Sequence, residues 1–130
     1  MNLRRFITAQ DGIRGNYTLY ELALKEIKEG ELSFECWVRY IFPQLKRKHT
    51  SKLTDFYGLD NREEAIEYIN NPILKERLIK ALQILIDSDK PIYNVFSSLG
   101  VLKIRSCVLL FSSISDEPVF KQLIKKYHWQ

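Results

Sequence analysis

The sequence predicts an all-α fold: a single compact domain over residues 1–130, made of seven or eight short helices with no large sheet. Three observations favour this class. A chain of 130 residues with 45% hydrophobic and 28% charged residues has the size and composition of one globular domain. Five Gly and four Pro are too few for a turn-rich barrel or sandwich. Apolar residues recur instead at helical spacing along the chain.

Three helices are predicted in the first third of the chain. The first helix is short, and the residues that recur at helical spacing in it are Leu3, Phe6, Ile7 and Gln10. The second has one face formed by Tyr17, Tyr20, Leu24 and Ile27, and Gly30 can end it in a left-handed cap. The third contains Phe34, Trp37, Val38 and Ile41. It should end at Pro43, because the residue before a proline avoids the helical region.

The remaining helices follow a basic loop. Asp60 and Glu63 predict a capping box that starts a helix with Ala65, Ile66 and Ile69 inward. Asn71-Pro72 should cap and start the next helix, whose apolar stripe is Leu74, Leu78, Ala81, Leu82 and Leu85. On its exposed side, Glu76 and Lys80 are spaced as an i,i+4 pair.

The C-terminal third begins with a short segment from Pro91 through Tyr93 and Phe96. The stretch from Val101 to Phe111 is apolar on nearly every side, which is typical of a central buried helix. A last helix is predicted from the spacing of Val119, Phe120, Leu123, Ile124 and Tyr127.

Positive charge is concentrated in one loop of the sequence YIFPQLKRKHTSK. Four basic residues stand there without an intervening acid, and their number equals the net charge of +4: Lys46, Arg47, Lys48 and Lys52. Such a stretch is either a solvated loop or the phosphate-facing rim of a site. In a rim, His49, Thr50 and Ser51 would add hydrogen-bond donors.

The sequence argues against several functional classes. No apolar run approaches the length of a membrane span, and the N-terminal residues lack the apolar segment of a secretion signal. Cys36 and Cys107 lie in apolar stretches, as buried reduced thiols do, which predicts a cytoplasmic location. His49 and His128 lack metal-ligand spacing, and no catalytic or cofactor motif is present. We therefore predict no metal and no cofactor. An enzyme of this sequence would depend on Ser, Tyr, Glu and Arg alone.

Several short motifs occur together along the chain. They are RF-x-x-AQ (Arg5, Phe6, Ala9, Gln10), YIFPQL (Tyr40 to Leu45), a serine before a Tyr-Gly pair (Ser51, Tyr57, Gly58), EA-x-x-Y-x-x-x-P (Glu64, Ala65, Tyr68, Pro72), RL (Arg77, Leu78) and K-x-RS (Lys103, Arg105, Ser106). In these motifs the chain resembles, from roughly Leu3 to Tyr127, the bacterial family known as domain of unknown function 1810, some members of which are labelled calpastatin. The resemblance implies a mainly helical domain and brings no established activity.

Arg105 is the residue most informative about function. At helical spacing it shares a face with Val101, Leu102, Val108 and Leu109. A charge left buried and unpaired on such a face would cost several kcal/mol, so an anionic or carbonyl-rich partner must meet it. That partner is either internal, such as Glu21, Glu64, Asp55 or a helix C-terminus, or a bound phosphate or carboxylate.

Other polar residues near the apolar helices have two interpretations each. Lys103 and Ser106 are neighbours on a helix turn, where they are solvated or contact an anion, since their order is the reverse of the catalytic Ser-x-x-Lys pair. Gln44 and Gln10 stand beside apolar residues, where an amide either ties a loop to the backbone or contacts a ligand.

The preferred hypothesis from these residues is binding of a small anionic, nucleotide-like ligand in a cleft between the end of the YIFPQ helix and the KIRS helix. The candidate ligand-binding residues are Arg105, Lys103, Ser106, Gln44, Lys46, Ser51, Tyr57 and Gln10. The alternative is an interaction module whose basic loop docks on an acidic protein or on nucleic acid. Aromatic residues beside the charges suit stacking of single strands, although neutralising several phosphates requires a footprint wider than one loop.

Overall fold

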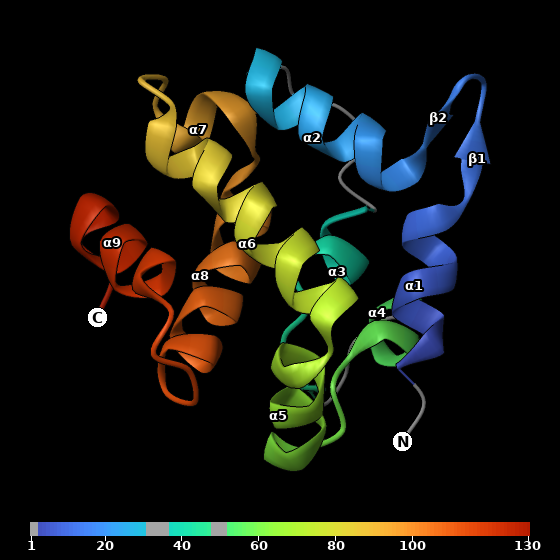
Figure 1. The fold of residues 1–130 in the computed structure, drawn as a ribbon. Coiled ribbons are helices and arrows are strands. Elements are labelled where there is room, and N and C mark those ends of the chain that lie inside the picture. The colour runs from blue at the N-terminus through green and yellow to red at the C-terminus, as the bar shows by residue number, and fades with distance from the viewer. Residues whose placement is uncertain (1–2, 31–36, 48–51) are drawn as a thin grey trace.

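Helices dominate the computed structural model, which describes residues 3–30, 37–47 and 52–130 (Figure 1). The N-terminal helices are α1 (Arg4–Asp11), α2 (Leu19–Glu29), α3 (Val38–Ile41) and α4 (Lys52–Tyr57). They are followed by α5 (Arg62–Asn70), α6 (Pro72–Asp87), α7 (Ile92–Val95), α8 (Ser98–Ser112) and α9 (Pro118–Tyr127). Within the described residues, β-structure is confined to a hairpin of β1 (Ile13–Arg14) and β2 (Tyr17–Thr18) and a bridge between Leu45 and Leu59. The all-α class with no large sheet is therefore confirmed.

Helix α6 is the centre of the packing. It contacts α2, α5 and α9, and Figure 1 shows it running through the middle of the molecule. Helix α8 packs against α3, α5, α7 and α9. Its inward face is buried, but Leu102, within the stretch from Val101 to Phe111, is 52% exposed, so the expected central buried helix has one side at the surface.

A series of aromatic rings joins helices that are distant in sequence. The Phe6 ring on α1 meets Tyr68 on α5 edge-on, with ring centroids 5.1 Å apart. Tyr68 in turn contacts Phe111 on α8 at 5.6 Å, and Phe111 stacks on Phe120 of α9 at 5.9 Å. All four residues are fully buried. Because aromatic pairs in these arrangements contribute beyond their buried area, this series holds the two ends of the chain together.

The hairpin corrects the predicted start of the second helix. Tyr17 was expected on a helical face, but it lies in β2 and pairs with Arg14, while Ile13 pairs with Thr18. Gly15 makes the tight turn possible because its φ of +63° is in the region that favours glycine. Helix α2 starts at Leu19 with a capping box between Thr18 and Glu21, and Gly30 ends it in the predicted left-handed conformation.

Three predicted features of α5 and α6 differ in the structure, and two are confirmed. Asn61, not Asp60, caps α5, and its side-chain oxygen accepts from the Glu64 amide at 2.9 Å. Ile66 is 40% exposed, contrary to expectation, and the buried residue is Tyr68. Asn71 caps α6 and Pro72 begins it, as the sequence predicts. The ion pairs of the described residues do not include one between Glu76 and Lys80.

Lys126 of α9 closes the C-terminal end of α6. Its Nζ donates to the carbonyl oxygens of Leu85, Ile86 and Ser88 at 2.6, 2.9 and 2.7 Å. A cation at a helix C-terminus satisfies unpaired carbonyls and interacts favourably with the helix dipole.

We expect Lys126→Met to lower the free energy of unfolding by about 1–2 kcal/mol, since it removes a charge from these carbonyls and keeps the side-chain length. Urea denaturation followed by circular dichroism measures the change. Lys125→Met is the matched control, because Lys125 is exposed in the same turn. Equal effects of the two substitutions would show that the contacts of Lys126 with α6 do not stabilise the fold.

Candidate functional site

Arg5 fixes the end of α4 against α1 and α5. Its guanidinium contacts Glu64 with both outer nitrogens, NH2 to Oε1 at 2.8 Å and NH1 to Oε2 at 3.3 Å. It also donates to the carbonyl oxygens of Phe56 at 2.8 Å and Gly58 at 3.0 Å. Glu64 is 1% exposed and Arg5 11%, so the pair is shielded from water. These bonds position residues 56–58.

The YIFPQ segment is held beside the same residues by its backbone. Lys46 N donates to the Leu59 carbonyl at 2.8 Å, and Leu59 N donates to the Gln44 carbonyl at 2.9 Å. Helix α3 ends just before Pro43, as predicted, so the chain leaves the helix and runs extended past Leu59. The Gly58 backbone therefore lies close to Lys46.

Replacing Gly58 by alanine should destabilise the protein by about 1–3 kcal/mol through overpacking. A Cβ at position 58 would lie 2.9 Å from Lys46 Cα, which is backbone and cannot move without disturbing the bridge to Leu59. Thermal unfolding measures the loss. Gly15→Ala is not a suitable control because of its positive φ. Gly12→Ala is the control, because its Cβ would lie 3.1 Å from the end of the Leu19 side chain and 3.3 Å from the Ala9 carbonyl oxygen, with no contact under 3.0 Å. The account would be contradicted by an unchanged melting temperature for Gly58→Ala.

A small hollow lies where these two segments meet. It is lined by Arg39, Gln44, Leu45, Arg47, Tyr57 and Gly58, and its volume is about 10 Å³. That volume is about enough for one water-sized atom. Two of the lining residues carry a guanidinium, and none carries a carboxylate. The hollow can therefore accept one oxygen of an anionic group whose other oxygens face the two arginines.

Gln44 and Tyr57 add neutral donors to this positive surface. Gln44 is 9% exposed and is a buried residue of this lining. Burial raises the pKa of the Tyr57 phenol, and the nearby charge of Arg5 partly offsets this effect. The phenol consequently stays protonated near neutral pH and can donate a hydrogen bond.

The other candidates from the YIFPQ side have different surroundings. Lys46 forms an exposed ion pair with Asp60 at 2.9 Å, at the outer edge of the bridge. Ser51, Lys48, His49 and Thr50 lie outside the described residues, as do Phe34 and Cys36. Arg39 was not singled out from the sequence. The only feature of the sequence that could have indicated Arg39 as a site residue is its position one residue before the YIFPQ motif.

Gln10 lies in the interior and not at the hollow. Its Nε2 donates to the Tyr40 carbonyl at 2.8 Å, and its Oε1 accepts from Arg77 NH1 at 3.2 Å. Arg77 also pairs with Asp11 at 2.8 Å. The glutamine therefore ties α3 to α1 and α6, which is the anchoring interpretation of a buried amide.

The residues of α8 are not among those that line the hollow. Arg105 NH2 donates to the Gln130 carbonyl oxygen at 3.3 Å, and its buried Nε has no hydrogen-bond partner among the residues that the structure describes. Two carboxylates considered as its partner are engaged elsewhere, Glu64 by Arg5 and Glu21 by the N-terminus of α2. The side chain of the third, Asp55, is not described. Lys103 and Ser106 are partly buried on the same helix.

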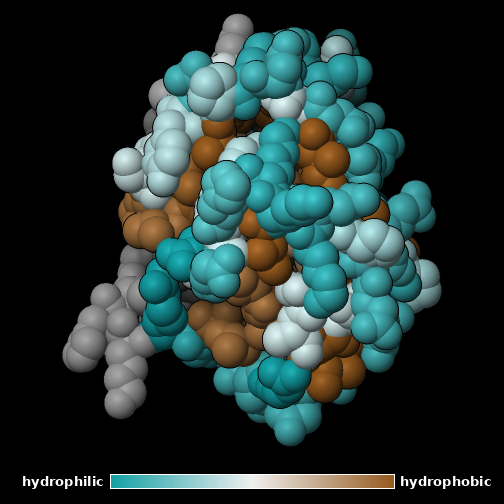
Figure 2. Space-filling model, turned by 90° about the vertical axis from the view of Figure 1, so that its left-hand side faces the viewer, coloured by the Kyte–Doolittle hydropathy of each residue, from teal (hydrophilic) through white to brown (hydrophobic). Residues whose placement is uncertain are grey.

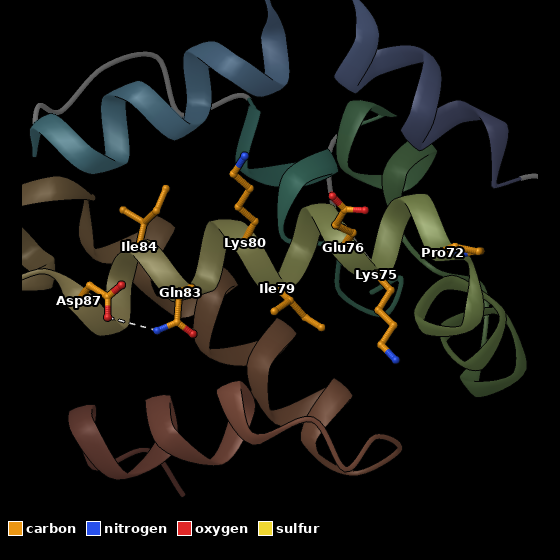
Figure 3. Close-up of a pocket in the computed structure, with 8 residues that line it drawn as sticks. All are labelled: Pro72, Lys75, Glu76, Ile79, Lys80, Gln83, Ile84 and Asp87. Carbon is orange, nitrogen blue, oxygen red and sulfur yellow. Dashed lines mark hydrogen bonds between the residues drawn. The ribbon is translucent and has the colours of Figure 1, made fainter.

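A larger groove runs along the exposed side of α6 (Figure 3). It has a volume of about 640 Å³ and is lined by Pro72, Lys75, Glu76, Ile79, Lys80, Gln83, Ile84 and Asp87. In Figure 3, Lys80 and Glu76 extend toward α2, while Lys75 and Ile79 extend toward α9. Hydrophobic areas also interrupt the hydrophilic surface on the side of the molecule shown in Figure 2. The charges along this groove are mixed, so it selects no class of ligand by charge.

Two further classes of site are absent from residues 3–30, 37–47 and 52–130. No group of three or more His, Cys, Asp or Glu side chains there is arranged to hold a metal ion. Among the helices of these ranges, none has both the length and the apolar character needed to cross a membrane. Cys107 is a free, fully buried thiol, and burial raises its pKa.

Comparison with known proteins identifies the family. No protein of curated function matches the chain significantly. The crystal structure of the conserved hypothetical protein Rv1873 from Mycobacterium tuberculosis is similar, with a TM-score of 0.86 and 28% sequence identity over 97% of this chain and 86% of that chain. The family model described as "Protein of unknown function (DUF1810)" matches residues 1–129. The chain therefore belongs to the DUF1810 family.

Proposed function

We propose that this protein binds a small anionic ligand, in the cytoplasm, at the hollow beside the YIFPQ segment. The observation that supports this most directly is the lining of the hollow: two arginines, a buried amide and a protonated phenol, with no acid among the six residues. Arginine is suited to oxyanions because its planar fork of donors matches a carboxylate or phosphate. A guanidinium carries five donors, so contacts within the chain still leave capacity for a ligand.

The backbone around the hollow is held in place by hydrogen bonds and by a buried ion pair. Backbone bonds fix Gln44 and Lys46 against Leu59, and the buried Arg5–Glu64 pair fixes Gly58. Preorganised donors bind an anion without first losing conformational freedom. This supports a site on the YIFPQ side alone, without Arg105, Lys103 or Ser106.

Titration with inorganic phosphate tests the proposal, with amide and arginine side-chain NMR signals as the readout. We expect the signals of Arg39, Arg47 and Tyr57 to shift together with one dissociation constant. Arg47→Ala should weaken binding by about tenfold or more, as expected for loss of a charged hydrogen bond. Arg14→Ala is the matched control, because it removes the same charge from the exposed hairpin. The proposal fails if these signals do not shift, or if Arg14→Ala weakens binding equally.

The same titration distinguishes an interaction module that docks by surface charge. Docking of several exposed cations on an acidic protein or on nucleic acid weakens steeply as salt rises. A single oxyanion held between two guanidiniums depends less on salt. A steep loss of affinity between low and moderate salt would therefore favour the docking alternative.

A further inference from the structure

An exposed aromatic ring packs against Tyr57, one of the residues that line the hollow. Phe56 is 57% exposed, although it is fully apolar. Its ring packs edge-to-face with Tyr57, at a centroid distance of 4.8 Å and an angle of 81°. Tyr57 is itself one of the residues that line the hollow. An exposed hydrophobic ring is therefore in contact with one of the residues that line the hollow.

The position of this ring is fixed from the interior. Tyr57 contacts the ring of the fully buried Phe6 at 6.1 Å and that of Tyr40 at 5.2 Å. The Phe56 carbonyl accepts a hydrogen bond from Arg5 Nε, and Arg5 is held by Glu64. Phe56 is thus preorganised at the surface, which lowers the entropic cost of stacking a ligand on it.

A ligand that uses both parts of this surface must be anionic at one end and planar and apolar at the other. Stacking of bases on aromatic side chains beside a positive groove is the usual way in which proteins hold unpaired nucleotides. A simple carboxylate or inorganic phosphate would leave the Phe56 ring in water. Leu45, which is 40% exposed and lines the same hollow, adds a second apolar contact.

We infer that the ligand is a nucleotide, with its phosphate between Arg39 and Arg47 and its base stacked on Phe56. This inference rests on the proposed function, since the phosphate end uses the same hollow. The nucleotide is either free or the phosphorylated end of a single-stranded oligonucleotide, because both present the same phosphate and base.

Four ligands separate the contributions of the two ends: AMP, ribose 5-phosphate, adenosine and inorganic phosphate, each titrated calorimetrically. AMP should bind about tenfold more tightly than ribose 5-phosphate, the gain expected from one stacked base. Adenosine should bind more weakly than AMP by at least the same factor. A 5′-phosphorylated trinucleotide that binds more tightly than AMP would identify an oligonucleotide end as the source; equal affinity would identify the free nucleotide.

Phe56→Ala should reduce the affinity for AMP to that for ribose 5-phosphate and leave binding of ribose 5-phosphate unchanged. Tyr93→Ala is the matched control, because Tyr93 is an equally exposed aromatic residue on α7, at 62% exposure. Equal affinities of wild type for AMP and ribose 5-phosphate would overturn the nucleotide inference while the anion site stands. Absence of binding by all the phosphorylated ligands would overturn both.

Discussion

Glu64→Ala is expected to lower the free energy of unfolding by about 3–5 kcal/mol, the loss typical of a broken buried ion pair. Glu64 is 1% exposed, and its removal takes away the buried carboxylate that the Arg5 guanidinium contacts at 2.8 Å. The Asp60 amide, which donates to Glu64 Oε1 at 2.9 Å, loses its acceptor as well. Chemical denaturation measures the effect as a shift in the midpoint at constant slope.

Asp60→Ala is the control for this substitution. Asp60 is one residue beyond the bridge, and its ion pair with Lys46 is exposed, with side-chain exposures of 53% and 44%. An exposed pair is screened by solvent, so the midpoint should stay close to that of wild type. If both variants lost a similar amount of unfolding free energy, burial of the Arg5–Glu64 pair would not determine how much that pair stabilises the fold.

Gln10→Leu should lower the free energy of unfolding by about 2–4 kcal/mol, because it removes the buried hydrogen bonds of Gln10 to the Tyr40 carbonyl and to one Arg77 nitrogen. The volume of the side chain is nearly kept, so the loss reports the hydrogen bonds and not a cavity. We also expect faster hydrogen exchange of the α3 amides, since the bond to Tyr40 ties this short helix to α1.

Gln122→Leu is the matched control for Gln10, because Gln122 is exposed on α9. The free energy of unfolding of the Gln122→Leu variant should be close to that of wild type. If Gln10→Leu were also near neutral, the buried amide would not be an anchor of α3, and α3 would have to be positioned by its apolar contacts alone.

Local signals in the sequence predict the parts of the fold that depend on neighbouring residues. Asn71-Pro72 at the start of α6 and Gly30 at the end of α2 are examples, since each acts within one turn of a helix. The sequence does not predict the hairpin, because its strands have two residues each, too few for an alternating pattern. The Asp60 cap was placed one residue early because Asp60 and Asn61 are both good caps.

The candidate site depends on contacts between distant residues, which a single sequence does not reveal. Arg5 and Glu64 are 59 positions apart, and their pairing fixes one wall of the hollow. Gln44 and Tyr57 were found because they belong to motifs, and the fold brings both to the hollow. Helical spacing and the K-x-RS motif place Arg105 among the candidates, but it does not line the hollow. Helical spacing predicts the face of a helix on which a residue lies, but not which residues pack against that face. In the structure, Arg105 of α8 contacts the carbonyl oxygen of Gln130.

A crystal structure of the protein grown with AMP tests the central claim most directly. The account predicts one phosphate oxygen in the hollow, other phosphate oxygens about 2.7–2.9 Å from nitrogens of Arg39 and Arg47, and the base against the Phe56 ring. A phosphate bound at Arg105 on α8 instead, or AMP found only in the groove along α6, would contradict it.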